Sequence, residues 1–332
     1  MALIEASIEG PIQSVTSDAG AGVVVQAMAI TVHFAPGTTS SGRTKTIKTP
    51  VTTLTPAQFI DGKKFPGRAE NGFVGGTIIA EGAFDTDTNT LEADFITVEP
   101  AETVILGALT ANQPGPPRVL KINGCPIEML TDDRMPSNPA DPANPVFMNQ
   151  YGFPMNINSA TVSPNGPTPT PPPAPSSAEG YFANGVFHAF LFEYGGTGQL
   201  SVDPAVTPQV SLERASYRDR GNEFEVEARG FVTTSHVPAG SAEQSIRLFR
   251  VDRNPTTGLL VENQIPASNS NDLDIDRIEP GFERWRFRTR RTKPSGFLSG
   301  VPLLIRVKNL SGIDPATGVP AKADVEPDVR EA

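Results

Sequence analysis

Residues 80–84 have the sequence AEGAF, and residues 91–95 have the sequence LEADF. These two segments indicate the domain organisation of the chain. A similar pair occurs 98 residues later, as AEGYF at residues 178–182 followed by FHAFL at residues 187–191. Each pair has the length and the residue types of two short strands joined by a turn. A period of this size corresponds to a whole domain and not to a solenoid repeat. We therefore predict two copies of one small β domain.

Upstream of the first pair, residues 4–15 alternate between apolar and polar side chains. Residues 23–34 predict one long strand that carries Met28, Ile30, Val32 and Phe34 on one face. Thr55 before Pro56 predicts the capped start of a short helix. Five short strands with a helical turn between the third and fourth are the outline of an OB-like barrel, which we predict over residues 1–105.

The second copy is predicted over residues 106–197 as a degenerate OB-like barrel. Its first strand is matched only weakly, through IEGPI at residues 8–12 and INGCPI at residues 122–127. Seven prolines between residues 164 and 175 favour polyproline II and cannot join a central strand. We expect a long Pro-rich surface loop at this point, within the second barrel.

The third region, residues 198–312, contains evenly spaced apolar segments separated by turn residues, which is typical of a β-sandwich. We predict strands over residues 210–212, 215–217, 224–228, 246–251, 285–288 and 303–307. The final residues, 313–332, are polar and contain proline, so we expect an extended tail that needs a docking surface to be ordered.

Composition agrees with an all-β chain, because 33 prolines and 30 glycines imply many turns between short strands. The net charge of −10 argues against nucleic acid as a partner, since phosphate binding needs clustered cations. No window approaches the ~20 apolar residues of a membrane-spanning helix. The first ten residues lack the basic and apolar regions of a signal peptide, so we expect any export to use another route.

Several short motifs resemble known domain families. The stretch FVGG at residues 73–76, together with residues 80–82 and 91–93, resembles a bacterial OB-like barrel domain of unknown function that occurs in tandem in surface and secreted proteins. Residues 215–217, 224–228 and 304–309 are similar to the early and final strands of bacterial immunoglobulin-like domains. The resemblance implies two barrels followed by an immunoglobulin-like sandwich, and it implies no catalytic residues.

Two acidic motifs suggest chemistry at first sight. Asp85, Asp87 and Asn89 alternate like the ligands of a calcium loop, but Thr90 replaces the required glycine and Ile96 replaces the bidentate glutamate. We interpret this motif as a hairpin turn. Asp274 and Asp276 could be paired carboxylates of a glycosidase, but the chain contains one Trp and four Tyr, too few for the usual stacking aromatics.

The strongest basic motif is RWRFRTR at residues 284–290, in which arginines alternate with Trp285 and Phe287. Arg291 and Lys293 extend this positive stretch. The functional interpretation is a docking face for carboxylates or a polyanion, formed by Arg284, Arg286, Arg288 and Arg290. The structural interpretation is an exposed strand face balanced by neighbouring acids. Separately, Glu223, Glu225 and Glu227 alternate with Phe224, Val226 and Ala228, which we interpret as the polar face of another strand.

No other residues indicate a catalytic, cofactor or metal site. Cys125 is the sole cysteine, so it cannot form an internal disulfide, and we expect a small packed side chain. One cysteine and the scattered His33, His188 and His236 do not make a zinc cluster. No nucleophile elbow, zinc-protease motif or phosphate loop is present. The sequence therefore predicts no cofactor and no enzyme.

These features lead to three hypotheses about function. The first is a structural protein that binds copies of itself and assembles into a surface or extracellular filament or layer, with a virion component as a variant. The second is a module that binds polysaccharide, an acidic protein surface or another polyanion. The third is a hydrolase that depends on Asp276. Tandem β modules, the basic motif and the C-terminal tail favour the first hypothesis.

Overall fold

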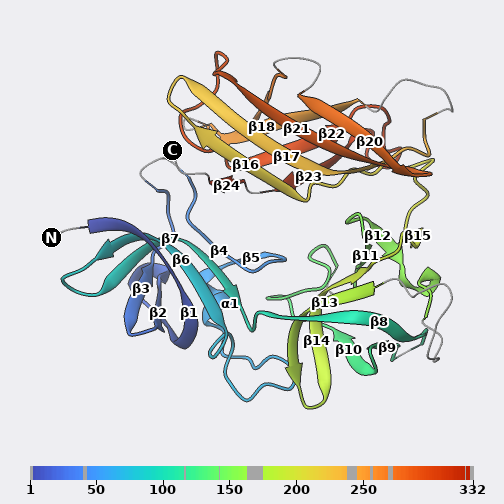
Figure 1. The fold of residues 1–332 in the computed structure, drawn as a ribbon. Helices are drawn as coiled ribbons and strands as arrows, with labels where there is room; N and C mark the ends of the chain where they lie inside the picture. Colours follow the sequence, from blue (N-terminus) through green and yellow to red (C-terminus); the bar gives the residue numbers. More distant parts are fainter. Residues whose placement is uncertain are drawn as a thin grey trace. The chain divides into compact units, whose positions relative to one another are not determined.

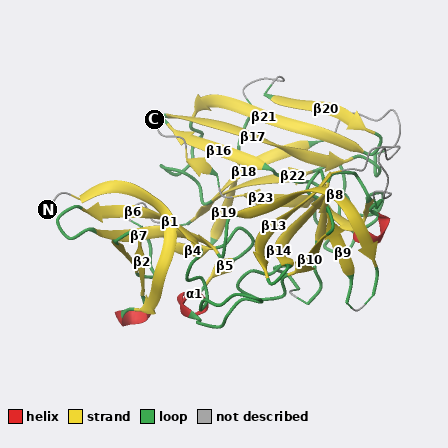
Figure 2. Cartoon of the chain, turned by 60° about the horizontal axis from the view of Figure 1, so that its bottom comes forward, coloured by secondary structure: helices red, strands yellow, loops and turns green. Residues whose placement is uncertain are grey.

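The computed structural model describes residues 3–39, 43–115, 117–141, 143–162, 175–237, 245–254, 257–267, 272–325 and 327–329. Strands make up 54% of the chain and helices 3%, which confirms the all-β class (Figure 2). The chain divides into two compact units (Figure 1). Unit 1 contains Met1–Met148 and Asn156–Gly198, and unit 2 contains Asn149–Met155 and Gln199–Ala332. The predicted Pro-rich loop lies almost entirely outside the described residues.

The first barrel of unit 1 is a five-stranded ring in the order β3-β2-β1-β6-β7, closed by parallel pairing of β3 with β7. The short strands β4 and β5 extend the same sheet beyond β7. The elements are β1 (Leu3–Ser17), β2 (Val23–Ala27), β3 (Ile30–Phe34), β4 (Thr46–Lys48), β5 (Thr53–Leu54), α1 (Pro56–Ile60), β6 (Thr77–Asp85) and β7 (Thr90–Glu99), with a 3-10 turn at Ala19–Ala21.

The second barrel repeats this order as β10-β9-β8-β13-β14, again closed by a parallel pair, β10 with β14. The sheet order then continues through β11, β12 and β15. The elements are β8 (Thr103–Gln113), β9 (Val119–Ile122), β10 (Cys125–Met129), β11 (Phe147–Asn149), β12 (Pro154–Asn156), β13 (Pro175–Ala183), β14 (Val186–Tyr194) and β15 (Gln199–Leu200), with a 3-10 turn at Ile157–Ser159.

The repeated AEG motif occupies equivalent places in the two barrels. The register of β6 against β7 shifts between Glu81 and Gly82, and the register of β13 against β14 shifts between Glu179 and Gly180. A Cβ atom on Gly82 would lie 2.1 Å from the Glu92 carbonyl oxygen, and one on Gly180 would lie 2.0 Å from the His188 carbonyl oxygen. Both glycines are therefore needed at a β-bulge where two backbones approach closely.

The prediction of one strand over residues 23–34 is wrong. The chain turns back at Met28 and Ala29, whose φ angles are 49° and 62°, so that β2 and β3 form a hairpin. Such a two-residue turn normally contains Asn or Gly, because both residues need a positive φ. The second barrel has the expected pair, Asn123 and Gly124, at the equivalent turn.

The weak match between residues 8–12 and 122–127 is also wrong, because residues 122–127 contain this second turn. The strand equivalent to β1 is β8, since Ile8 pairs with Ala80 and Ile105 pairs with Ala178. Gly10 of β1 lies against Met28, and Gly107 of β8 lies against Asn123.

The predicted helix cap is confirmed. The Thr55 side chain accepts a hydrogen bond from the Gln58 backbone amide, and the Gln58 side chain accepts one from the Thr55 amide. This capping box starts α1 with Pro56 at its first turn. The helix lies between β3 and β6, as an OB-like order requires, and it buries Phe59 in the barrel core.

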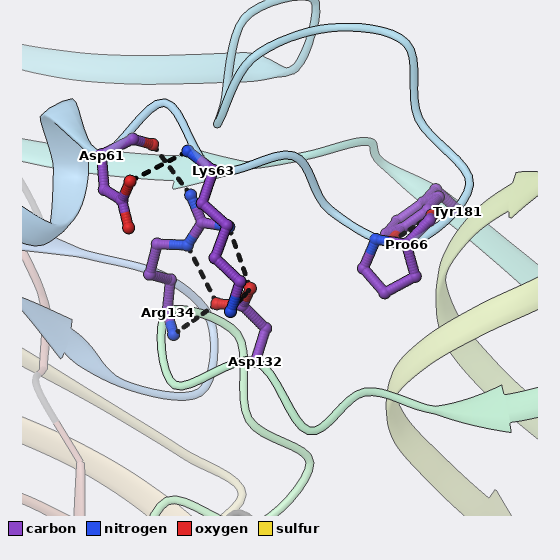
Figure 3. A network of polar contacts seen from close by, with 6 residues as sticks. All are labelled: Asp61, Lys63, Pro66, Asp132, Arg134 and Tyr181. Atoms are coloured by element: carbon purple, nitrogen blue, oxygen red, sulfur yellow. Dashed lines mark hydrogen bonds and ion pairs between the residues drawn. The ribbon is translucent and has the colours of Figure 1, made fainter.

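A buried ionic network joins the two barrels within unit 1 (Figure 3). Arg134, which is 1% exposed, donates two hydrogen bonds of 2.9 Å to the Asp132 carboxylate. Its third nitrogen donates to the carbonyl oxygen of Asp61 at 2.9 Å, in the segment that follows α1. The guanidinium also lies 4.1 Å above the Phe65 ring. Both barrels contribute to one hydrophobic core, which includes Phe65 and Tyr181.

Unit 2 contains the predicted sandwich of two sheets, with strand orders β20-β21-β17-β16-β24 and β19-β18-β22-β23. Its core contains Tyr217, Phe224 and Trp285, all of which are fully buried. The strands are β16 (Arg214–Asp219), β17 (Glu223–Thr233), β18 (Ile246–Arg253), β19 (Leu260–Gln264), β20 (Leu273–Glu279), β21 (Phe282–Thr292), β22 (Leu304–Asn309), β23 (Ala321–Val325) and β24 (Asp328–Val329).

Two parts of unit 2 differ from the expectations. Residues 210–212 make one isolated bridge, from Val210 to Val232, in place of a strand. In the segment expected to be an extended tail, β23 pairs with β22 and β24 pairs with β16. The chain's own sandwich is therefore the docking surface of these residues. No helix in the described residues is long and apolar enough to cross a membrane.

Candidate functional site: the outer face of the sandwich

The alternation predicted for the basic motif is present in β21. Trp285, Phe287 and Thr289 are buried, whereas Arg286, Arg288 and Arg290 are exposed. The Trp285 ring nitrogen donates hydrogen bonds to the carbonyl oxygens of Ser211 and Phe231, each at 3.2 Å, which fixes β21 in its place. The arginines therefore point to the outer face of the five-stranded sheet.

The two ends of the predicted arginine face are neutralised by the sheet itself. Arg284 forms an ion pair of 2.9 Å with Asp276 on β20, and Arg290 forms one of 2.8 Å with Glu223 on β17. Beyond the motif, Arg291 donates to the carbonyl oxygen of Ala267, and Lys293 pairs with Asp219 at 2.6 Å. The middle of the face, at Arg286 and Arg288, is where positive charge is least compensated.

Two arginines from neighbouring strands join this central region. Arg229 of β17 lies directly opposite both Arg286 of β21 and Arg214 of β16, so three arginines form one row across three strands. We call Arg214, Arg229 and Arg286 the arginine row. No sequence pattern indicated this row, because strand pairing brings together residues from three separate segments. The predicted strands over residues 215–217 and 224–228 do pair, but side-chain alternation does not determine their register.

The arginine row borders a surface cavity of about 380 Å³. The lining residues are Arg214, Ser216, Glu227, Ala228, Arg229, Arg286, Phe287 and Arg288. The side chain of Arg288 is 72% exposed and that of Arg229 is 59% exposed. Guanidinium groups here could reach a carboxylate, sulfate or phosphate group from several sides.

Carboxylates compensate part of the charge of the row, since Asp274 of β20 lies directly opposite Arg286. Like charges directly opposite each other on neighbouring strands destabilise a sheet, since their Cβ atoms are about 5 Å apart. Arg229 has Glu213 at 3.3 Å, and Arg288 has Glu225 at 3.9 Å and lies directly opposite Glu227. No hydrogen bond or ion pair joins Arg286 to any residue that the structure describes. A bound anion would add charge-assisted hydrogen bonds to the exposed Arg229 and Arg286.

Next to the row, the same face is covered by aromatic side chains of unit 2. Tyr151 packs against Phe231 and Phe282, with ring centroids 4.8 Å and 4.9 Å apart. Burial and then the neighbouring Glu279 carboxylate raise the pKa of Tyr151 to about 12. This part of the face is closed, which confines an external ligand to the arginine row and its surroundings.

The two acidic motifs serve local structure. Asp85 accepts a hydrogen bond from the Asp87 amide, and Asn89 donates one to the carbonyl oxygen of Ala29. These contacts belong to the hairpin turn, and the described residues hold no group of three or more potential metal ligands. Asp276 is the ion-pair partner of Arg284, and Asp274 lies opposite Arg286. Both carboxylates of the suggested glycosidase pair therefore lie among arginines.

The three histidines and the cysteine are separate from one another. His33 lies 3.4 Å from Asp18 and His188 lies 3.6 Å from Glu128. Burial lowers the pKa of His188 and of His236, so both are neutral at pH 7. Cys125 is a free thiol of intermediate exposure at the start of β10.

A cluster of three glutamates lies where the first barrel leads into the second. Burial, followed by the charges of Glu102 and Glu179, raises the pKa of Glu99 to about 7. Unfolded Glu99 ionises near pH 4.5, so its contribution to stability is complete below that pH and is lost as the pH rises through 7. At pH 8, ionisation of Glu99 is therefore expected to lower the free energy of unfolding of the wild-type protein.

Replacing Glu99 by Gln is expected to raise the free energy of unfolding at pH 8 by about 1 kcal/mol, after allowance for solvent screening. At pH 4.5 the variant and the wild type should differ little. Urea titrations at both pH values test this expectation, with Glu128→Gln as control because the Glu128 side chain is 66% exposed. A gain that is the same at both pH values would contradict it.

Comparison with known proteins does not identify the chain. No family model, no curated protein and no solved structure matches it.

Proposed function

We propose that this protein is a non-enzymatic structural protein that assembles with copies of itself, in a surface or extracellular filament or layer, and that the arginine row is one contact surface. The observation that carries the proposal is the row itself, in which three like charges lie side by side on an exposed sheet. Exposed guanidinium groups in such a row can form charge-assisted hydrogen bonds with the carboxylates of a partner surface.

The distribution of charge between the units supports this proposal. Unit 1 has 18 Asp and Glu against 9 Lys and Arg, whereas unit 2 has 19 against 18. Nearly all of the net charge of −10 therefore belongs to the barrels. A chain with an arginine surface on one unit and excess carboxylates on the other contains the charges for attraction between copies.

Light scattering and negative-stain microscopy at low and high salt test the proposal. We expect oligomers in about 20 mM salt and dissociation in about 500 mM salt, because exposed charges are screened over a few ångströms there. Arg286→Glu with Arg288→Glu should abolish assembly. The matched control is Arg247→Glu with Arg253→Glu, which changes the same charge at exposed positions of β18.

A protein that stays monomeric at every salt and protein concentration would exclude self-assembly. Retention of such a monomer on an acidic glycan, lost in the Arg286→Glu, Arg288→Glu variant, would instead establish polysaccharide binding. A specific observation favours this second function: the row offers several guanidinium groups around one cavity of about 380 Å³. A virion component would be a variant of the first function.

A further inference from the structure

We infer that the arginine row binds the outer face of the first barrel of a second copy, where Glu5, Glu9, Glu81 and Glu92 form an acidic face. This inference rests on the proposed self-assembly and adds the identity of the partner surface. All four glutamates are exposed.

The strand register places these carboxylates together. Glu5 of β1 pairs with Ala83 of β6, and Ala83 pairs with Glu92 of β7, so Glu5 and Glu92 lie in one row with a small residue between them. Glu81 is two residues before Ala83 and thus on the same face. Glu9 follows Glu5 on the outward side of β1. Strands β1, β6 and β7 lie side by side in Figure 1.

The acidic face lacks internal compensation. No described residue forms a hydrogen bond or an ion pair with any of its four glutamates. Two described cations near this sheet have other contacts: Lys45 pairs with Asp94 at 2.8 Å, and Arg43 lies over the Phe95 ring at 4.4 Å from its centroid. Mutual repulsion of four exposed carboxylates on three strands is a cost that a positive partner would remove.

The two surfaces share a geometry because each is the outer face of a β-sheet. Neighbouring strands are about 4.8 Å apart, and alternate residues of one strand are about 6.8 Å apart. Both faces therefore present charges on grids of the same spacing: arginines on β16, β17 and β21, and glutamates on β1, β6 and β7. Two or more guanidinium–carboxylate pairs can form at once in several relative orientations.

A contact in which one surface of a copy binds a different surface of the next copy is heterologous. Each copy presents one arginine row and one acidic face to other copies, so addition continues until a ring closes or a filament grows. The pairing therefore accounts for an open polymer without any second interface.

Neutralised variants test the inference by sedimentation velocity. Arg229→Gln with Arg286→Gln removes one surface, and Glu81→Gln with Glu92→Gln removes the other. Each variant alone should be monomeric, with its self-association weakened by at least about 100-fold. A one-to-one mixture should form dimers and nothing larger, since the first variant keeps the acidic face and the second keeps the arginine row. Far-UV circular dichroism should show both variants folded, because all four side chains are exposed.

Two controls and one repeat of the test make the outcomes distinct. Arg247→Gln with Arg253→Gln, and Glu70→Gln with Glu128→Gln, remove the same charges elsewhere and should assemble like the wild type. Glu5→Gln with Glu9→Gln repeats the test of the acidic face. If the glutamate variants still polymerise while the arginine variant does not, the acidic face is overturned and the arginine contact stands. A wild type that never assembles overturns the proposed function as well.

Discussion

Replacing Arg134 by Ala is expected to lower the free energy of unfolding of unit 1 by about 3–5 kcal/mol. The substitution leaves the Asp132 carboxylate, whose side chain is 4% exposed, without its two hydrogen bonds of 2.9 Å. It also removes the donor to the carbonyl oxygen of Asp61 and the packing over Phe65. The Asp132 carboxylate keeps the backbone amide of residue 134 and the exposed Lys63, but a buried charge that has lost its main partner is among the most costly results of a single substitution.

The ionisation of Asp132 shows the same coupling. Burial acts to raise the pKa of Asp132, but hydrogen bonds from Arg134 outweigh it and hold the pKa below its usual value. This group therefore contributes stability above about pH 4 that is lost as the pH falls through its lowered pKa. In the Arg134→Ala variant the hydrogen bonds from the Arg134 side chain are lost, while the backbone amide of residue 134 and Lys63 still lower the pKa of Asp132. The carboxyl group should therefore take up a proton at a higher pH than in the wild type.

Urea unfolding, monitored by circular dichroism, measures the decrease in the free energy of unfolding of the Arg134→Ala variant. Hydrogen exchange of β7 and β14 assigns this decrease to unit 1. The fluorescence of Trp285, which is buried in unit 2, should report little change. Lys63→Ala is the matched control: Lys63 is 3.6 Å from Asp132 but its side chain is 66% exposed, so its loss should cost under about 1 kcal/mol. Equal losses in both variants would show that the network does not hold the barrels together.

A further variant separates charge from packing. Arg134→Leu combined with Asp132→Leu removes both charges and should recover part of the stability lost in Arg134→Ala. Such a recovery would show that Arg134 stabilises unit 1 mainly by compensating the buried charge of Asp132. The net attraction within the ion pair would then be small.

The sequence predicted the features that depend on local pattern. Alternation identified the outward arginines of β21, and the TP pair at residues 55–56 identified the start of α1. The repeated AEG motif pointed to two barrels because the bulge demands a glycine at the same place in both. Each of these signals lies within a few residues of the feature that it predicts.

The features that the sequence did not predict depend on contacts between distant segments. The sequence analysis did not identify Arg134, because its role as a buried link depends on contacts with the distant Asp61 and Phe65. The arginine row requires the register of three strands, which side-chain alternation does not determine. The turn at Met28 and Ala29 was missed because its residues lack the usual preference for a positive φ.

Replacing Gly82 or Gly180 by Ala is expected to lower the free energy of unfolding by about 3 kcal/mol or more in each case. The new Cβ atom would lie 2.1 Å from the Glu92 carbonyl oxygen in the first variant and 2.0 Å from the His188 carbonyl oxygen in the second. Neither oxygen belongs to a flexible side chain. The backbones of the paired strands must separate, which weakens the ladder on both sides of the bulge.

Gly62→Ala is the control, because the nearest atom to its added Cβ is Asn71 Cβ at 3.9 Å and its φ is not positive. There the substitution should be neutral or should stabilise by a few tenths of a kcal/mol, since alanine reduces the entropy of the unfolded chain. Urea titrations of the three variants make the comparison. Losses at Gly82 and Gly180 within about 0.5 kcal/mol of the Gly62 value would contradict the close approach.

Comparing the stability losses of the two glycine variants also tests which feature of the repeated bulge requires glycine. The residues around them differ: the extra residue of the bulge is Asp94, paired with Lys45, in the first barrel and the buried Phe190 in the second. If both glycine variants lose similar stability, the common requirement is the backbone approach and not the neighbouring side chains. A large loss at Gly82 alone would mean that the second barrel tolerates an altered bulge, with Phe190 free to repack around it.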